Sequence, residues 1–543
     1  MKRLLVLGGG YTAVYACRAL GAGIAAGDLE VTVVTRDNFL CAHGLISEMV
    51  TGRLMPGTIL NPARRIFGRA HVHVGEIERI DLGERRVHTT RHIDGARFEL
   101  EYDEALLALG TSENLDAYPG LAEHAYKLKS FEDCFALRNH VIEMFELADI
   151  ERDSEERRRL LTFFVAGGGF AGTEIAGELA DLARLLTSRE YRGIKREECR
   201  VVIVHPGATL LPELYGSGSL ERKSKSFPKL VAYAMRHCEK LGVELMLETK
   251  VAGATPNEVY LSNGEHIPTR TIVSTVGTKP SPLLAGLSLP FDDRGRVRVD
   301  SVMRVLGREE LWAGGDCAAV PHPKGGTCPP TALWAAKQGK YLGRNIARAA
   351  AGKAPRPFRA MVRKQGVSLG RRTAVSEVNG IPLRGKVSWV GFRAVVFTLV
   401  PSWDRRLRML SDWTLWPLVG RDIVQMGRGQ RSGYDVQRHV YQPGETIVEA
   451  SRPLRYVHVV TEGQAEVLRD GEVAITIGPG GHFGRKWLEQ HDAEAVRART
   501  LVRTLVLHAD QANVLQDVLL SSEPLIAKTM LRPALVEEPR ERP

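Results

Sequence analysis

Two stretches of the chain show the same change from an apolar run to glycines and then to small residues at helical spacing. Residues 3–7 read Arg-Leu-Leu-Val-Leu and run into Gly8-Gly9-Gly10. Residues 161–166 run into Gly167-Gly168-Gly169 in the same way. A buried strand that turns sharply into a helix has this pattern. We therefore predict a strand, a glycine turn and a helix at both places.

Both turns keep a spacing of small residues that leaves room for a pyrophosphate at the helix N-terminus. The three positions are Gly8, Gly10 and Ala13 in the first turn, and Gly167, Gly169 and Gly172 in the second. The first permits the tight turn, the second lets the phosphate approach the backbone, and the third keeps the helix close to the sheet. One match is weak evidence, because any glycine turn between a strand and a helix can show it. Two matches indicate two dinucleotides held face to face.

The strands that follow each turn end without the acidic residue that often binds a ribose hydroxyl. The predicted strand over 29–36 ends in Thr35 and Arg36, and a hydroxyl can still make that contact. The predicted strand over 200–205 ends in His205. We count these three residues among the cofactor-binding ones.

Other buried segments end in residues that suit a ligand. The strand that begins at 102 ends in Ala108-Leu109-Gly110, where backbone can pass close to a cofactor. Another ends at Gly315-Asp316; the carboxylate can bind a ribityl hydroxyl, and the next helix can point its N-terminus at a phosphate. The predicted cofactor-binding residues of these segments are Ile77, Ala108, Gly110, Gly277, Gly315 and Asp316.

Three further elements complete the predicted body. Residues 71–80 and 86–90 are predicted strands of a small antiparallel insert, and 130–151 is a predicted helix. A strand and turn over 273–280 return the chain to the first domain. Glu174 lies in the first turns of the second nucleotide helix, beside the expected nicotinamide; alternatively it is an exposed glutamate favoured by the helix dipole.

Composition limits the classes of protein. A chain of 543 residues exceeds one core, so we expect about three domains. The net charge of +10 fits nucleic acid, an anionic membrane or a solvated face, but no nucleic-acid motif or zinc spacing is present, so we expect neither nucleic acid nor a metal. The seven cysteines lack paired spacing, which indicates a reduced, cytosolic chain. We predict no signal peptide and no transmembrane span.

In this order the motifs resemble the flavoproteins with two dinucleotide-binding domains, which bind FAD at the first turn and NAD(P)H at the second. Several segments are similar to the type II NADH dehydrogenases, the non-proton-pumping NADH:quinone oxidoreductases: 118–121, 129–133, 137–139, 174–178, 329–332, 338–340 and 368–372. The likeness covers about residues 1–430. It implies FAD and NAD(P)H as cofactors, hydride transfer to the flavin, and a quinone as acceptor.

The resemblance also assigns roles and has departures. It makes Glu174 a nicotinamide-side polar group or proton relay, and places Lys337 and Gln338 where a quinone would arrive. The family usually reads A-Q-x-A-x-Q-Q there, and Leu333 and Lys337 replace two of its glutamines, which puts quinone reduction in doubt. His205 likewise leaves the choice between NADH and NADPH open, because an imidazole does not reject a 2′-phosphate as a carboxylate does.

Thiol chemistry is a further alternative. The chain lacks the C-x-x-x-x-C motif of the disulfide-reductase relatives. Cys134, Cys317 and Cys328 admit a sulfide:quinone oxidoreductase interpretation. Cysteines among small residues are more often inert packing.

Residues 388–427 hold most of the tryptophans together with several arginines, and Pro401 and Pro417 divide them into short predicted helices. Indole rings and long basic side chains favour the membrane–water boundary, where such a helix lies on the surface. Type II dehydrogenases have C-terminal amphipathic helices here. The alternative is that the rings form a homodimer interface or cover a core.

From Tyr434 onward, short strands with regular glycine turns predict a small β-roll that resembles the cyclic-nucleotide-binding domain. In that family an F-G-E turn and an R-x-x-[ST] stretch bind the ribose and the cyclic phosphate. Arg497 and Thr500 match the second motif, but Gly484 is followed by Arg485 instead of the acid. Cyclic-nucleotide binding and an empty docking or regulatory module both remain open.

Together these features predict an α/β fold with two Rossmann-like domains, the NAD(P) domain being inserted in the FAD domain. The predicted parts are the FAD domain (1–115 and 271–350), the NAD(P)H domain (116–270), a membrane-facing segment (351–432), a β-roll (433–533) and a disordered tail (534–543). The expected function is electron transfer from NAD(P)H through FAD to a quinone, on the cytoplasmic face of a membrane, with a regulatory β-roll. A soluble reductase of another acceptor and a redox or nucleotide sensor with little turnover are the alternatives.

Overall fold

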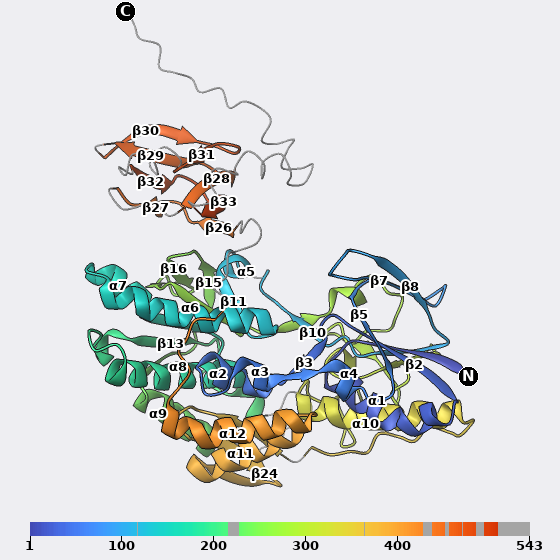
Figure 1. Cartoon of the computed structure of the whole chain (residues 1–543). Coiled ribbons are helices and arrows are strands. Elements are labelled where there is room, and N and C mark those ends of the chain that lie inside the picture. The colour runs from blue at the N-terminus through green and yellow to red at the C-terminus, as the bar shows by residue number, and fades with distance from the viewer. Residues whose placement is uncertain are drawn as a thin grey trace, which may run out of the picture.

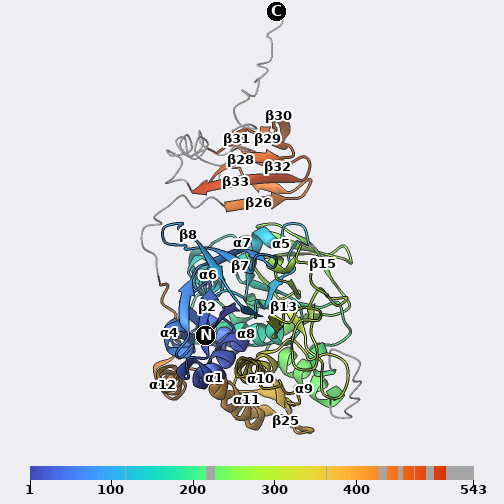
Figure 2. The same ribbon diagram turned by 90° about the vertical axis from the view of Figure 1, so that its right-hand side faces the viewer.

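The computed structural model of the protein describes residues 1–116, 118–215, 227–362, 364–426, 437–450, 456–469, 471–484 and 494–508. Position 427, Arg485 and the predicted tail lie outside these residues. The chain forms a two-part α/β body with paired helices at one end and a β-roll at the other (Figure 1). Figure 2 shows the same order from the side. The predicted fold class is confirmed.

The first unit is built on a five-stranded parallel sheet in the order β21-β9-β1-β2-β5. Its strands are β1 (Lys2–Leu7), β2 (Leu29–Thr35), β5 (His71–Val74), β9 (Glu104–Leu107) and β21 (Leu311–Ala313). Helix α1 (Tyr11–Ala25) leaves the first glycine turn, and α10 (Ala332–Ala350) packs along it. The two backbones are so close that a Cβ at Gly343 would lie 2.3 Å from the carbonyl oxygen of Ala16.

Strand β5 corrects one expectation. It pairs in parallel with β2 as the edge of the main sheet, with His71 opposite Thr32, and is not part of the antiparallel insert. That insert comprises β6 (Glu76–Asp81), β7 (Arg86–Thr90) and β8 (Arg97–Glu101). Alternating residues fit an edge strand of either kind, so the sequence pattern did not distinguish them.

The second unit repeats the architecture, with the parallel order β11-β18-β12-β13-β14. Its strands are β11 (Ala125–Lys127), β12 (Thr162–Ala166), β13 (Arg200–Val204), β14 (Val243–Met246) and β18 (Thr271–Ser274). We expected the chain to be back in the first domain at residue 271, but β18 lies beside β12 in the second sheet. The antiparallel pair β10 (Thr111–Glu113) and β19 (Thr278–Pro280) joins the two units.

The helices of the second unit are α6 (Phe131–Ile150), α7 (Ser154–Leu160), α8 (Phe170–Arg189) and α9 (Phe227–Lys240). Helix α6 confirms the helix predicted over 130–151. A three-stranded antiparallel sheet of β15 (Val251–Ala254), β16 (Glu258–Leu261) and β17 (His266–Pro268) completes the unit.

A sheet that the sequence pattern did not predict packs against α8, α9 and the helix that follows it. It comprises β23 (Lys364–Ser368), β24 (Ala374–Val378) and β25 (Ile381–Arg384). It packs on α8, where a Cβ at Gly177 would lie 2.4 Å from the carbonyl oxygen of Leu369. Helices α11 (Gly385–Leu399) and α12 (Trp403–Val419) follow. Helix α12 runs through position 417, so the predicted break at that proline is wrong.

The β-roll consists of two four-stranded antiparallel sheets, in the orders β26-β33-β28-β31 and β27-β32-β29-β30. The strands are β26 (Gln437–Tyr441), β27 (Thr446–Val448), β28 (Tyr456–Glu462), β29 (Ala465–Arg469), β30 (Glu472–Ile477), β31 (His482–Phe483), β32 (Ala495–Ala498) and β33 (Val502–His508). The predicted roll is confirmed. The remaining short elements are β3 (Phe39–Cys41), β4 (Leu60–Pro62), β20 (Val297–Arg298), β22 (Ala318–Ala319), α2 (Ile46–Val50), α3 (Pro56–Ile59), α4 (Ala63–Ile66) and α5 (Leu121–His124).

Candidate functional site

The first glycine turn has the geometry of a phosphate cradle. Gly8 is left-handed (φ +115°), and a Cβ there would lie 2.3 Å from the carbonyl oxygen of Ala108. A Cβ at Gly10 would meet no atom within 4 Å, so space lies in front of the helix that begins at Tyr11. The first turn of α1 carries no acidic residue to repel an anion. These features fit the pyrophosphate of a dinucleotide.

The Gly315-Asp316 turn lies beside this cradle, at the same edge of the sheet. Gly315 donates its N–H to Oε1 of Gln338 (2.7 Å), and a Cβ at Gly315 would lie 2.6 Å from Oγ1 of Thr12 on α1. Gln338 is therefore buried, whereas the neighbouring Lys337 is exposed on α10. The two residues thus lie in different surroundings, and Gln338 holds the Gly315-Asp316 turn.

Asp316 lies in a partly exposed cluster of titratable side chains to which both units contribute. Burial raises the pKa of its carboxyl, and the charges of Lys129 and His43 counteract that rise. The Lys129 ammonium donates to Oγ1 of Thr111 (2.8 Å), and Nε2 of His43 lies 2.7 Å from the carbonyl oxygen of Lys129. Lys129 follows β11 of the second unit, so the two units meet at the Gly315-Asp316 turn. The sequence pattern predicts a binding role for Asp316 but indicates no role for His43 or Lys129.

The ends of β2 and β6 are less suited to a ligand than predicted. The Thr35 hydroxyl donates to the carbonyl oxygen of Asp37 (3.1 Å) and would lie 2.2 Å from a Cβ at Gly9, so it packs beneath the turn. Arg36 is half exposed and pairs with Asp37 (3.7 Å). Ile77 is buried in the apolar core of the first unit. The backbone of Gly110 and Gly277 is left-handed and has open space beside it.

The second glycine turn repeats the first in its backbone. Gly167 donates its N–H to the carbonyl oxygen of Val204 (2.8 Å) and is left-handed (φ +107°). A Cβ at Gly172 would lie 1.9 Å from the carbonyl oxygen of Gly167, so only glycine permits this contact between the helix and the turn. The two turns differ in their side-chain contacts. In the second turn, Gly168 N–H donates to Nδ1 of His205 (3.2 Å) and Phe170 N–H donates to Oε1 of Glu213 (3.0 Å).

Glu174 is a largely buried carboxyl on α8. Its Oε1 accepts the backbone N–H of Ser368 on β23 (3.1 Å). Burial raises its pKa to about 8, and the carboxylates of Glu48 and Glu178 add to the rise. The raised pKa favours the protonated carboxyl of Glu174 at neutral pH, and the partly buried side chain is not the exposed helix residue of the alternative interpretation. One turn farther along α8, buried Glu178 and Asp181 bind Arg53 and Arg421, which joins α8 to the chain after α12.

The thiols offer no reactive group. All seven cysteines are buried and free. Burial raises the pKa of Cys317 to about 11 and that of Cys328 to about 12, and it also raises the pKa of Cys134. Since the thiolate is the nucleophile, these side chains are inert at neutral pH.

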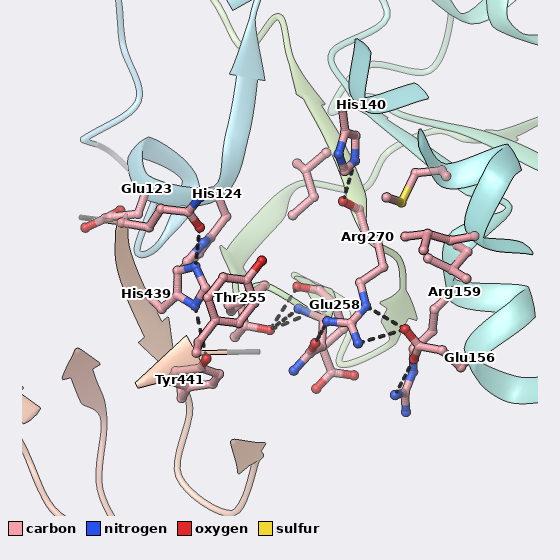
Figure 3. Close-up of a pocket in the computed structure, with 18 of the residues that line it drawn as sticks. Glu123, His124, His140, Glu156, Arg159, Thr255, Glu258, Arg270, His439 and Tyr441 are labelled. Atoms are coloured by element: carbon pink, nitrogen blue, oxygen red, sulfur yellow. Dashed lines mark hydrogen bonds and ion pairs between the residues drawn. The ribbon is translucent and has the colours of Figure 1, made fainter. Parts of the chain in front are cut away.

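The β-roll contacts the second unit around a cavity of about 1470 Å³. Figure 3 shows His124 and His439 side by side, with Arg270 and Glu156 paired on the opposite wall. Val440 donates its N–H to Nε2 of His124 (3.0 Å), and burial lowers the pKa of that imidazole to about 3. The buried, neutral imidazole therefore helps to hold the roll in place.

The residues predicted to bind a cyclic nucleotide already make contacts within the β-roll. Arg497 is ion-paired with Glu466 of the neighbouring strand (2.9 Å), and Oγ1 of Thr500 accepts the N–H of Gln464 (2.9 Å). Gly484 is left-handed, and the residue after it lies outside the described range. An incoming phosphate would have to displace Glu466.

Family models match both parts of the chain. The model described as pyridine nucleotide-disulphide oxidoreductase matches residues 2–339. The chain belongs to this family. Members of the family bind FAD and NAD(P)H. Residues 438–518 match the model of the cyclic nucleotide-binding domain.

Among individual proteins, the chain is similar in sequence to NAD(P)H:quinone oxidoreductases. The chain is 27% identical over 455 residues to an internal alternative NAD(P)H-ubiquinone oxidoreductase A1 of Arabidopsis thaliana, covering 78% of this chain and 86% of the relative. It is 25% identical over 461 residues to the type II NADH:quinone oxidoreductase Ndh of Mycobacterium tuberculosis, covering 82% and 93%. The resemblance to type II NADH dehydrogenases is confirmed at this level.

The fold agrees with a solved relative. The structure of NDH2 from Plasmodium falciparum in complex with NADH superposes with a TM-score of 0.69 at 16% identity, covering 78% of this chain and 99% of that chain. Within the described part of the chain, no helix has the length and apolar character needed to cross a bilayer.

Proposed function

We propose that the protein is an FAD-dependent NAD(P)H:quinone oxidoreductase that works at a membrane surface. The observation that supports this most is the pair of glycine turns at the N-termini of α1 and α8, in two units that meet at Asp316 through Lys129. Two phosphate cradles on adjoining sheets can hold two dinucleotides. The quinone as acceptor rests on the relatives described above.

The chain's own residues bind, orient and hold protons. We assign Gly8, Gly10, Gly315 and Asp316 to FAD, and Gly167, Gly169 and Gly172 to NAD(P)H. A bound flavin supplies the redox chemistry, because it accepts a hydride from a nicotinamide and passes electrons to an acceptor. Glu174 holds a proton near neutral pH and lies on the same helix as the NAD(P)H cradle, so we propose it as the proton-holding group of the site.

The paired helices α11 and α12 form the membrane-binding surface that we propose for the protein. Trp403, Leu407 and Leu418 of α12 are exposed by 69, 64 and 83%. Both views place α10 beside α11 and α12, at the end of the molecule opposite the roll (Figures 1 and 2). The exposed Lys337 and Arg344 of α10 add positive charge at that end. Apolar and basic side chains together favour the surface of an anionic bilayer. We place the protein there, on the cytoplasmic face, with the roll turned away as a regulatory domain.

Steady-state oxidation of NADH with and without menadione tests the quinone assignment. We expect flavin-loaded protein to oxidise NADH faster with the quinone, and liposomes with anionic lipid to bind the protein. An enzyme that reduces other acceptors but not quinones would support the soluble-reductase alternative. Negligible turnover with every acceptor would support the sensor alternative.

A further inference from the structure

The second glycine turn differs from the first in one contact that a ligand would need. Phe170 N–H at the start of α8 donates to Oε1 of Glu213 (3.0 Å), and that oxygen would lie 2.4 Å from a Cβ at Gly169. Nothing lies within 4 Å of the corresponding Cβ position at Gly10 in the first turn. One cradle is therefore open, and the other is capped by a carboxylate of the same chain.

The backbone around Glu213 holds it at this position. The residue lies in a short 3-10 turn (Pro212–Tyr215), and Leu214 of this turn and Leu210 and Leu211 before it are fully buried. Leu211 donates its N–H to the carbonyl oxygen of Gly168 (2.8 Å) and has a left-handed backbone (φ +59°), which leucine rarely adopts. The loop is thus fixed against the turn, while the Glu213 residue itself is exposed and its side chain can rotate into solvent.

We infer that Glu213 is a specificity-determining residue, whose carboxylate competes with the phosphates of the nicotinamide dinucleotide for the N-terminus of α8. The inference rests on the proposed function. A helix N-terminus favours one anion, and a carboxylate that occupies it repels a phosphate until it is displaced. The competition is stronger against NADPH than against NADH, because a 2′-phosphate adds nearly two further negative charges.

Glu213 also stands in for the acid missing from the end of β13. His205 occupies that position, and its Nδ1 accepts from Gly168. Burial lowers the pKa of His205, and the negative charge of Glu213 counteracts the change, so the carboxylate lies within electrostatic reach of the imidazole. A negative charge from the following loop can therefore discriminate against a 2′-phosphate where the strand end itself cannot.

The other role open to Glu213 is that of a helix cap. A side-chain oxygen that accepts a backbone N–H in the first turn of a helix stabilises the helix, and removing such a cap lowers the free energy of unfolding by about 1 kcal/mol. A pure cap would lower stability on removal and leave dinucleotide affinity unchanged or weaker. Competition predicts the opposite change in affinity.

The test compares Glu213→Gln and Glu213→Ala with the wild-type flavin-loaded protein. Glu190→Gln is the control, because it removes the same charge at the exposed opposite end of α8. The measurements are dissociation constants of ADP-ribose and of NADP⁺, the KM and kcat for NADH and NADPH, and the melting temperature. ADP-ribose carries the pyrophosphate but no nicotinamide, so its binding reports on the cradle alone.

We expect both Glu213 variants to bind ADP-ribose about tenfold more tightly, which corresponds to about 1.4 kcal/mol. KM should fall for both substrates, more for NADPH, with kcat nearly unchanged, and added salt should reduce the difference from wild type. Unchanged or weaker binding in both variants would overturn the inference while leaving the proposed function standing. A wild-type protein and variants that bind neither ADP-ribose nor NADH would overturn both.

Discussion

At the scale of single residues, the glycine spacing predicted the two cradles because a close backbone contact requires glycine at several of its positions. Gly8, Gly167 and Gly172 have no room for a Cβ, and this follows from the strand, the turn and the helix on either side. Glu213 and Lys129 could not be found in the same way. Their partners Phe170 and Asp316 lie far away in the sequence, and no local pattern specifies which loop returns to a turn.

Gly10 and Gly8 make a matched pair for testing the first cradle. We expect Gly10→Val to fold, because its φ of −77° suits any residue and its Cβ meets no atom within 4 Å, but to lose most of its FAD. We expect Gly8→Ala to lose several kcal/mol of stability, because its Cβ would collide with the carbonyl of Ala108 at a left-handed position. The measurements are flavin content and urea unfolding. Stoichiometric FAD in Gly10→Val would contradict the assignment.

Glu174 gives the site a predictable dependence on pH. The unfolded carboxyl ionises near pH 4.5 and the folded one near 8, so wild-type stability falls as pH rises between these values. Glu174→Gln can still accept the Ser368 N–H and carries no charge. We expect the variant to match wild type at pH 4.5 and to exceed it by about 2–4 kcal/mol at pH 9. A difference that does not change with pH, measured by urea unfolding, would show that the carboxyl is not buried as described.

At the scale of elements, strands and helices with strong periodicity were predicted correctly and weakly patterned ones were not. Helix α6 and the strands at the two turns agree with the structure, whereas β23, β24 and β25 were missed. Strand β25 (Ile-Pro-Leu-Arg) has no fully buried residue, so it lacks the alternation that marks a half-buried strand. The same sheet supplies Ser368 to Glu174, so missing it concealed part of the site.

Helix α12 can be tested as a membrane-binding element. We expect the double variant Leu407→Glu and Leu418→Glu to lose at least tenfold in liposome binding, because each leucine contributes about 2 kcal/mol when buried in the acyl boundary. Both side chains are exposed, so stability should not change. The matched control is Ile93→Glu with Ile150→Glu, two exposed isoleucines outside the segment. Equal flotation of both double variants would favour the dimer-interface alternative instead.

At the scale of the whole molecule, the sequence indicated the parts but not how they join. The fold class and the roll were predicted from local patterns. The strand β18 in the second sheet, the contact of the roll with the second unit through His124 and Val440, and the ionic link from Arg421 to α8 are all long-range. Such contacts depend on the final packing, which single-sequence periodicity does not record.

The central claim is that the two cradles hold a flavin and a nicotinamide close enough for hydride transfer. Anaerobic titration of the purified, flavin-loaded protein with NADH and with NADPH tests it most directly. We expect the flavin absorbance to bleach with about one reduced nicotinamide per flavin. A folded protein that carries no flavin, or whose bound flavin stays oxidised in the presence of both nucleotides, would contradict it.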